Sequence, residues 1–296
     1  MSTSLDTHPR VTALLDGPLG WHTVHHHPEA TSTSDVALEL AQQGVPPGAI
    51  VVADHQTAGR GRRGRAWVDH SGEGETRSLL VSVLLPVPER DATLTPLAVG
   101  LAVGDALRRA GATPTLKWPN DVLLLEVPPG TAPGGVSGAS PDAAPEGVGT
   151  SRTLPTAKCA GILVDRHTIG AGEVLVVGVG IDLDWRGVAR DDDAAAWTSL
   201  AEATGRDVDR GDVLADLLRG LSVWVRSVTT DPTRMLVAYR DSCATVGRDV
   251  AVTFPDGERL TGRAVDLDRE GRLIVDSPAV GKVAITAGDV EHVRPS

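Results

Sequence analysis

A short run of arginine and glycine residues is the part of this chain best suited to bind an anion. Residues 59–67 read Gly-Arg-Gly-Arg-Arg-Gly-Arg-Ala-Trp and carry four arginines on one loop: Arg60, Arg62, Arg63 and Arg65. Guanidinium groups match the geometry of phosphate and carboxylate. Four of them this close repel one another until an anion arrives, and the glycines let the backbone fold closely around it. The run predicts a loop that is mobile when empty and orders around a phosphorylated ligand.

The spacing of Gly59, Gly61 and Gly64 also satisfies the Gly-x-Gly-x-x-Gly fingerprint of dinucleotide-binding proteins. That fingerprint requires a helix to begin at its end, with backbone N–H groups facing the pyrophosphate. Here residues 67–72 read instead as a turn into a predicted strand at 79–85. Spaced Gly-Arg repeats also occur in disordered nucleic-acid-binding tails, but this run follows an apolar, strand-like stretch. We therefore favour an anion-binding loop.

The pentapeptide Lys-Trp-Pro-Asn-Asp at residues 117–121 is a second candidate for chemistry. The chain uses arginine almost exclusively as its basic residue, its only asparagine is Asn120, and its only lysines are Lys117, Lys158 and Lys282. Lysine supplies a compact charge on a flexible stem, which the wide guanidinium fork does not. Asn-Asp is also ordinary turn chemistry. Beside an arginine loop, we interpret Asp121 as a candidate base or metal ligand and Lys117 as a candidate anion partner.

Lys158 begins a third segment, Lys-Cys-Ala-Gly-Ile-Leu-Val, which is typical of a strand. Gly161 within it, and Gly178 on a later strand, leave room for a ligand beside the backbone. The alternative for Lys158 is a solvated charge at a strand end. No histidine pairs with Cys159 in the sequence, so we expect that cysteine to be a small buried hydrophobic residue.

The composition indicates an acidic globular protein. The chain has 296 residues, a formal net charge of −11 and a pI near 5.2, which argue against broad nucleic-acid binding. A hydrophobic content of 41 % supports a substantial core, and no apolar run is long enough to span a membrane. Two cysteines give neither a zinc spacing nor a disulfide framework, so we expect a cytoplasmic protein. We expect no metal at the histidines of residues 22–27, because no second group of ligands completes a site.

The hydrophobic pattern predicts both strands and helices along the chain. A helix follows the cap residues 31–35 and ends at Gly44, and further helices are expected at 96–110, 213–228 and 233–241. Strands are expected at 21–27, 50–53, 79–85, 116–118, 122–125, 160–164 and 174–179.

We expect four regions along the chain. Residues 1–20 read as a tail, residues 21–242 as the catalytic domain, and residues 126–157 as a disordered insertion rich in proline and glycine. Residues 243–296 contain short strands at 249–254, 259–266, 271–276 and 282–286 joined by turns, which predicts a small β-barrel.

Taken together, the three motifs resemble those of the biotin–protein ligases over about residues 20–294. The resemblance implies an α+β fold: a class II synthetase-like ligase domain, with a mixed sheet flanked by helices, and a small SH3-like C-terminal barrel. It also implies ATP and Mg²⁺ as cofactors, biotin as the substrate, a biotin carboxyl carrier domain of an acyl-CoA carboxylase as the acceptor, and a possible homodimer. With about twenty residues before the first predicted strand, we expect no DNA-binding helix-turn-helix and no nucleic-acid partner.

The same resemblance implies a role for each motif residue. Lys158, Arg62 and Asp121 would be catalytic, with Asp121 also a possible Mg²⁺ ligand. The adenylate would contact Arg63, Arg65, Trp67, Lys117 and Asn120. Biotin would contact Ser32, Thr33, Ser34, Gln56, Arg60, Gly61, Arg62, Lys158, Gly161 and Gly178, and Ile162 would also line the pocket.

Three positions depart from the family pattern: Ser34 and Asp182 stand where asparagine is usual, and Cys159 stands where leucine is usual. An ionised Asp182 would be repelled by an adenylate and is expected to point away from it. Two other functions stay open at this point. One is a lipoate or octanoyl ligase or transferase of the same fold, and the other is a nucleotide-sensing binding module without catalysis.

Overall fold

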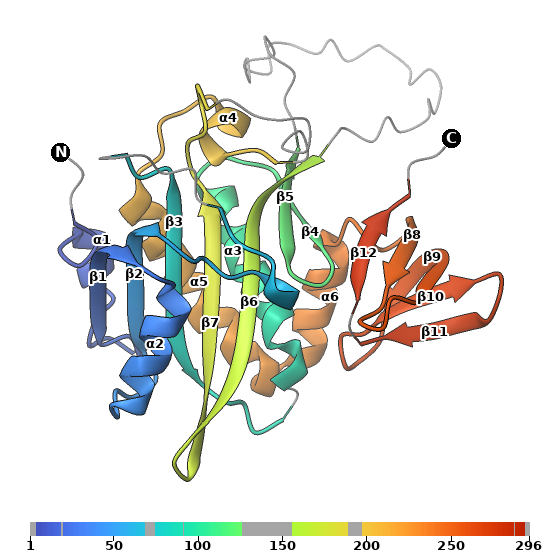
Figure 1. Ribbon diagram of the computed structural model, residues 1–296, viewed down its shortest axis with the longest axis horizontal. Coiled ribbons are helices and arrows are strands. Elements are labelled where there is room, and N and C mark those ends of the chain that lie inside the picture. The colour runs from blue at the N-terminus through green and yellow to red at the C-terminus, as the bar shows by residue number, and fades with distance from the viewer. Residues whose placement is uncertain are drawn as a thin grey trace, which may run out of the picture.

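The computed structural model describes residues 4–18, 20–68, 75–90, 92–125, 156–188, 197–286 and 288–293. The main body of this described part is a seven-stranded sheet in the order β1-β2-β3-β7-β6-β5-β4 (Figure 1). Strands β1 and β2 are parallel, and the other neighbouring pairs are antiparallel, so the predicted mixed sheet is confirmed. The strands are β1 Thr23–Ala30, β2 Ala49–Gln56, β3 Ser78–Pro86, β4 Pro114–Lys117, β5 Asp121–Leu125, β6 Thr156–Ile169 and β7 Gly172–Asp182.

Helices cover both faces of this sheet. On one face Ala37 and Ala41 of helix α2 pack against alternate residues of the central strands, among them Val51 and Val176. On the other face α3, α5 and α6 enclose the larger core (Figure 1). Strands β2 and β3 are buried on both faces and read as continuous apolar runs, which is why the sequence predicts them. The helices are α1 Pro9–Thr12, α2 Thr33–Gln42, α3 Thr95–Arg109, α4 Leu200–Thr204, α5 Arg210–Thr230 and α6 Pro232–Ser242, with short 3₁₀ turns η1 Arg62–Gly64 and η2 Ala92–Leu94.

The expected N-terminal tail is instead packed against the body. Leu5 is 2 % exposed and Val11 of α1 is fully buried. Arg10 forms ion pairs of 2.8 Å with both Asp212 and Asp216 of α5. A helix of four residues is too short to show a helical period, so the sequence pattern gives no sign of it.

The predicted insertion at 126–157 falls almost entirely outside the described residues. Its last two residues, Thr156 and Ala157, belong to β6 and pair with β5, so the strand begins before the predicted residue 160.

The C-terminal strands form a second, five-stranded antiparallel sheet in the order β11-β10-β9-β8-β12 (Figure 1). This confirms a mixed α+β domain followed by a small β domain. The junction runs through Trp118, which is 3 % exposed and donates from its indole Nε1 to the Gly271 carbonyl at 3.0 Å. Its backbone N–H donates to Thr245 Oγ1 at 3.0 Å. The strands are β8 Asp249–Thr253, β9 Arg259–Leu267, β10 Leu273–Ser277, β11 Gly281–Ile285 and β12 Asp289–His292, the last of which was not predicted.

Among the described residues, the helices are too short or too polar for any of them to cross a membrane.

A pH dependence of stability follows from His292 at the end of β12. Burial, together with the positive charges of Lys117 and Arg248, lowers the pKa of this imidazole to about 4. A folded-state pKa below the unfolded value of about 6.5 means that the neutral imidazole stabilises the fold above pH 6.5. This contribution, roughly 2 kcal/mol after solvent screening, is lost as the pH falls toward 4.

We therefore expect His292→Gln to flatten this part of the pH profile. The measurement is the free energy of unfolding by urea at pH 7.0 and pH 4.5 for both proteins. The wild type should lose more stability than the variant between the two pH values, and equal losses would contradict the assignment.

Candidate active site

A cavity of about 130 Å³ opens on the α2 face of the sheet, under loop 59–67. Alternate residues of β7 explain why it lies there. Val174 and Val176 fill the space under α2, whereas Gly178 and Gly180 continue the same face with no side chain. The cavity is lined by Ser32, Thr33, Ser34, Gln56, Arg60, Gly61, Arg62, Arg65, Ala66, Trp67, Asn120, Asp121, Lys158, Gly161, Ile162, Leu163, Gly178, Val179, Gly180 and Trp197.

One end of the cavity is a cluster of small hydroxyl groups at the N-terminus of α2. Ser32 caps the helix by accepting from the Ser34 N–H. The Thr33 and Ser34 hydroxyls lie 2.8 and 3.0 Å from Ser82 Oγ, and Gln56 Oε1 accepts from the Thr33 N–H at 2.7 Å. Buried hydroxyls beside a helix N-terminus suit a neutral polar ligand with a partial negative charge.

Two glycines make room for the indole of Trp67. A Cβ atom at Gly180 would lie 2.5 Å from the Trp67 ring, and one at Gly161 would lie 2.7 Å from it. Gly178 similarly leaves space for Ser34, because a Cβ there would lie 2.8 Å from Ser34 Oγ. A larger residue at Gly161 or Gly180 would displace the Trp67 ring, and one at Gly178 would displace the Ser34 hydroxyl.

Lys158 and Asp121 form an ion pair in the cavity. Lys158 Nζ lies 2.8 Å from Asp121 Oδ1, and both side chains are largely buried, with exposures of 22 % and 19 %. The ammonium also lies 4.6 Å from the ring centroid of Trp197 and 5.5 Å from that of Trp67. Lys158 is therefore a positioned charge and not the solvated strand-end lysine of the alternative interpretation.

Each of the four arginines of loop 59–67 has a hydrogen-bond or ion-pair partner outside the loop. Arg60 pairs with Asp35 of α2 at 3.0 Å, and Arg62 donates to Asn120 Oδ1 at 3.0 Å. Asp289 of β12 accepts from Arg63 at 3.2 Å and from Arg65 at 2.7 Å.

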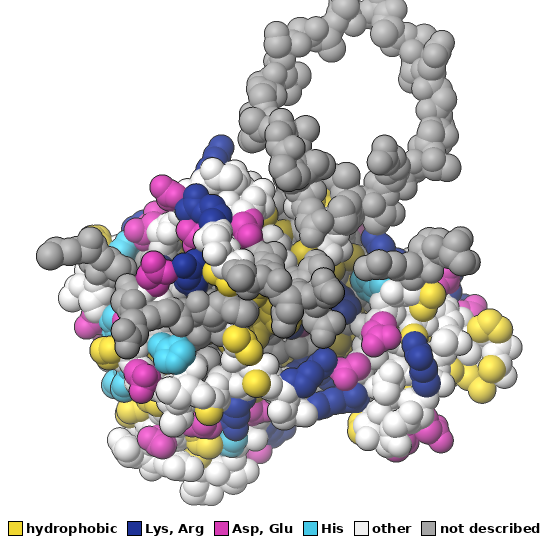
Figure 2. All heavy atoms as spheres, turned by 45° about the horizontal axis from the view of Figure 1, so that its top comes forward, with side chains coloured by type: hydrophobic (Ala, Val, Ile, Leu, Met, Phe, Trp, Pro, Cys, Tyr) yellow, Lys and Arg dark blue, Asp and Glu magenta, His cyan; other side chains and the backbone are white. Residues whose placement is uncertain are grey.

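These partners modify the prediction that the four cations stay unpaired until a ligand binds. The Asp289 carboxylate of the C-terminal domain already forms ion pairs with two of them. Two backbone hydrogen bonds close the loop, from the Trp67 N–H to the Gly59 carbonyl and from the Gly61 N–H to the Arg65 carbonyl. Lys and Arg side chains gather on the face where the main body meets the C-terminal domain (Figure 2).

Burial lowers the pKa of Arg62, and the neighbouring Arg63 and Arg65 charges act in the same direction. The carboxylates of Asp289 and Asp121 oppose this change. Because the ordinary pKa of an arginine lies far above neutral pH, Arg62 stays charged at pH 7 and keeps its affinity for an anion.

The structure brings most of the predicted site residues to the cavity but leaves two outside its lining. Arg63 lines an adjoining cavity against the C-terminal domain. Lys117 lines neither of these two cavities, and its charge acts on His292 of β12. Residues alternate sides along a strand and the chain turns at Trp118, so neighbours in one motif can face different regions.

The sequence motifs missed three residues that shape the site: Ser82, Trp197 and Asp289. Ser82 lies in the middle of an apolar strand, and Asp289 lies 226 residues from its partner Arg63. Trp197 follows a segment that the structure does not describe. The sequence of this segment shows neither a helical nor a strand period. Only the scarcity of tryptophan, six in the chain, could have singled it out.

Of the three positions that depart from the family pattern, Ser34 lines the cavity, whereas Asp182 and Cys159 do not. Asp182 is fully buried, accepts from the Ser78 hydroxyl at 3.3 Å and does not line the cavity. Cys159 is also fully buried, and burial and the Asp182 charge raise the pKa of its thiol, so it is not a reactive nucleophile.

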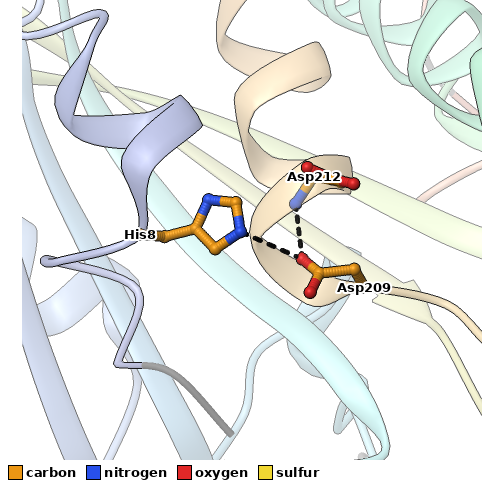
Figure 3. A group of neighbouring side chains, drawn as sticks. All are labelled: His8, Asp209 and Asp212. Carbon is orange, nitrogen blue, oxygen red and sulfur yellow. Dashed lines mark hydrogen bonds and ion pairs between the residues drawn. The ribbon is translucent and has the colours of Figure 1, made fainter.

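The described residues contain one cluster with the spacing of a metal site, and it lies elsewhere. His8 Nε2 lies 3.3 Å from Asp209, the N-cap of α5, whose carboxylate also accepts from the Asp212 N–H (Figure 3). This is the ordinary arrangement of a helix cap with a basic neighbour. The histidines of residues 22–27 do not belong to such a cluster.

Comparison with known proteins places the chain in a family. Residues 28–182 match the biotin/lipoate A/B protein ligase family, and residues 245–293 match the biotin protein ligase C-terminal domain. The chain is 32 % identical to the biotin–[acetyl-CoA-carboxylase] ligase of Mycobacterium tuberculosis, over 95 % of this chain and 93 % of that protein. It therefore belongs to the biotin/lipoate A/B protein ligase family.

Other relatives agree with this assignment. The bifunctional ligase/repressor of Bacillus subtilis is 27 % identical over 92 % of this chain and 74 % of its own length. The biotin protein ligase of Aquifex aeolicus, solved in complex with biotin and ATP, has a TM-score of 0.68 and 26 % identity, covering 92 % of this chain and 99 % of that one.

We predict that Asp289 holds loop 59–67 in its ordered form. Asp289→Asn should raise the amide hydrogen exchange rates of residues 60–66 in the ligand-free protein, because the charge that separates Arg63 from Arg65 is lost. Asp249→Asn is the matched control, since its partner Arg263 lies in the same small domain and away from the loop. Unchanged exchange in Asp289→Asn, or equal increases in both variants, would contradict the prediction.

Proposed function

We propose that this protein activates biotin with ATP as biotinyl-5′-AMP and transfers the biotinyl group to a lysine of a biotin carboxyl carrier domain. The observation that carries the proposal is the single cavity in which a polar hydroxyl end, a paired lysine and an arginine loop meet. The names of the relatives support biotin as the substrate and an acetyl-CoA carboxylase as the source of the acceptor.

The two ends of the cavity suit the two ends of biotin. The ureido head is neutral and polar, and the hydroxyl cluster of Ser32, Thr33 and Ser34 can hydrogen-bond to it. The valeryl carboxylate would then reach toward Lys158 and Arg62 at the other end. Small hydroxyls are a poor surface for the acyl chain of lipoate or octanoate, which favours biotin over that alternative.

In the first step an oxygen of the biotin carboxylate attacks the α-phosphorus of ATP. The bond between this phosphorus and the bridging oxygen to the β-phosphate breaks, and pyrophosphate leaves with the bonding electrons. Two anions approach one another, so cations must offset the charge that gathers on the α-phosphate. Lys158 and Arg62 would exchange Asp121 and Asn120 for the oxygens of the substrates, while the closed loop excludes water from the mixed anhydride.

In the second step the amine of the acceptor lysine attacks the carbonyl carbon of the adenylate, and AMP leaves. The attacking amine must lose a proton. We propose Asp121 as the group that accepts it, because its carboxylate lies in the cavity and becomes available once Lys158 contacts the adenylate.

Magnesium fits this site in a limited way. Asp121 offers one carboxylate, and Lys158 lies against it. Magnesium bound through one carboxylate, substrate phosphates and water is common in nucleotide enzymes. We therefore propose that Asp121 would be the protein group that holds Mg²⁺ beside the triphosphate, where the ion would supply positive charge to offset that of the leaving pyrophosphate.

Two further expectations remain proposals. Both cysteines are buried and free, which supports a reducing, cytoplasmic location. A homodimer also stays a prediction.

The proposal is tested by mass spectrometry of the small-molecule products after incubation with Mg-ATP, pyrophosphatase and either biotin, lipoate or octanoate. We expect biotinyl-AMP and phosphate release with biotin alone. Preferential formation of lipoyl- or octanoyl-AMP would favour the other ligase. A protein that binds ATP but releases no phosphate with any acid would instead be a nucleotide sensor.

We predict that Lys158→Ala lowers the rate of biotinyl-AMP synthesis by about tenfold to a hundredfold. A charge-assisted hydrogen bond of this kind contributes about 1.5–3 kcal/mol, and it is made most strongly in the transition state. Lys282→Ala is the control, since this lysine is exposed on β11. Far-ultraviolet circular dichroism would establish that both variants fold. An unchanged rate in Lys158→Ala would contradict the assigned role.

A further inference from the structure

Trp185 lies behind the cavity and has no role in the proposed chemistry so far. Its side chain is 2 % exposed, and it does not line the cavity. The indole stacks on that of Trp197, with ring centroids 6.2 Å apart and planes inclined by 20°. Trp197 in turn faces the cavity and places its ring 4.6 Å from Lys158 Nζ.

Hydrogen bonds also join the segments that carry Lys158, Trp197 and Trp185. Trp197 pairs with Lys158 in an isolated parallel bridge, and the Thr198 N–H donates to the Lys158 carbonyl at 2.8 Å. The Trp185 N–H donates to Ser199 Oγ at 3.0 Å. Trp197 is thus held at its backbone beside Lys158. The orientation of its ring depends on Trp185, which stacks on it, and on Trp67, whose ring lies edge-on with its centroid 5.6 Å away.

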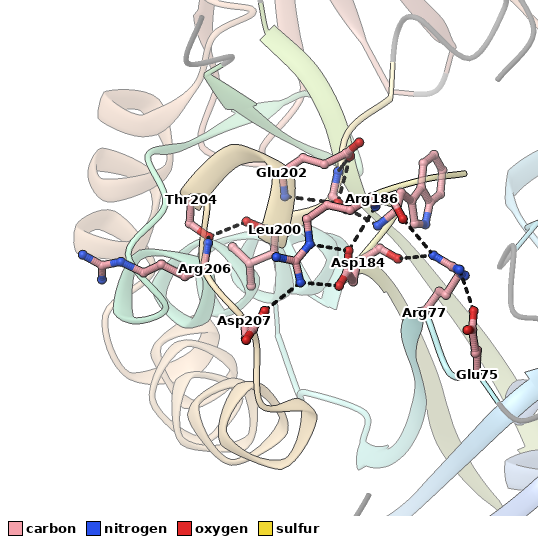
Figure 4. Close-up of polar contacts among 11 residues, drawn as sticks. Glu75, Arg77, Asp184, Arg186, Leu200, Glu202, Thr204, Arg206 and Asp207 are labelled. Atoms are coloured by element: carbon pink, nitrogen blue, oxygen red, sulfur yellow. Dashed lines mark hydrogen bonds and ion pairs between the residues drawn. The ribbon is translucent and has the colours of Figure 1, made fainter. Parts of the chain in front are cut away.

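Trp185 is itself firmly held. The N–H groups of Leu183 and Asp184 both donate to the Arg77 carbonyl, at 2.9 and 3.1 Å. The Arg77 guanidinium donates to the carbonyls of Asp184 and Arg186, on either side of Trp185 (Figure 4). Arg186 then pairs with Asp184 and with Asp207, which precedes α5 (Figure 4).

We propose that Trp185 is a positioning residue for the adenylation step. It fixes the ring plane of Trp197, and Trp197 together with Trp67 confines the Lys158 ammonium where the carboxylate and the α-phosphate must meet. The proposal rests on the proposed function and adds a residue that touches neither substrate.

The physical reason lies in the freedom of a lysine side chain. The lysine stem has four carbons joined by rotatable bonds. Asp121 fixes the ammonium only until a substrate oxygen takes the place of its carboxylate. An aromatic face attracts the ammonium whether or not Asp121 is paired with it. The rings of Trp67 and Trp197 therefore keep the ammonium in place while substrate oxygens replace Asp121. Small misplacements of a catalytic group can lower a rate by large factors.

The first test is spectroscopic and independent of catalysis. A ring that faces the ammonium at this distance should shift the Lys158 ε-methylene protons upfield in the NMR spectrum. With only three lysines, selective ¹³C labelling resolves this signal, and Lys117→Arg and Lys282→Arg variants assign it. We expect the upfield shift to decrease from wild type to Trp185→Phe and further to Trp185→Met, which retains bulk but has no flat ring.

The second test is kinetic. In biotin-dependent pyrophosphate exchange, Trp185→Met should lower kcat about tenfold while the KM values for ATP and biotin change less than threefold. Trp185→Phe should recover most of kcat. Trp224→Leu is the matched control, because Trp224 lies on α5 and its indole donates to Asp105 of α3, away from the cavity.

The outcomes are distinguishable. A Lys158 signal that stays constant along the Trp185 series overturns the positioning role even if the wild type proves inactive, and Trp185→Phe alone gives this answer if Trp185→Met does not fold. A kcat loss of equal size in Trp224→Leu also overturns it. A wild type that makes no adenylate, with the expected NMR shifts, contradicts the proposed function and leaves the packing of Trp185 on Trp197 confirmed.

Discussion

The ion pair between Lys158 and Asp121 is the interaction on which the rest of this site depends. A cavity that gathers a lysine and several arginines in a largely enclosed space is unstable unless each charge has a partner. The chain solves this with groups from distant segments: Asp121 for Lys158, Asp35 for Arg60, Asn120 for Arg62, and Asp289 for Arg63 and Arg65. Each of these cations thus has a partner within the protein, a carboxylate for four of them and a neutral amide for Arg62, and substrate anions can replace these partners.

This arrangement links the fold to the chemistry. The mixed sheet brings β5, β6 and β7 side by side, and the change from valine to glycine along β7 opens the cavity where α2 begins. The C-terminal domain contributes Asp289 from β12, and the buried Trp118 joins that domain to the turn that carries Asn120 and Asp121. A displacement of the C-terminal domain would therefore move both loop 59–67 and the ion pair between Lys158 and Asp121.

Much of this was accessible from the sequence, and what was not has identifiable physical causes. Strands such as β2 and β3 are buried on both faces and read as apolar runs, and the loop at 59–67 is marked by residue types that few structural roles require. The counter-charges were not accessible, because Asp35 and Asp289 look like any of the chain's acidic residues until folding places them beside arginines. Short elements such as α1 and α4 were missed for lack of periodicity, and Trp197 because an isolated tryptophan carries no motif.

The most direct measurement of the central claim follows the Lys158 ammonium through partner exchange. The ¹⁵N-detected resonance of its Nζ can be observed selectively, since the chain has only three lysines. We predict that biotin together with a non-hydrolysable ATP analogue moves the Lys158 resonance as Asp121 is replaced, while the Lys282 resonance stays in place. A Lys158 resonance that is unchanged at saturating ligand, with binding established by calorimetry, would contradict it.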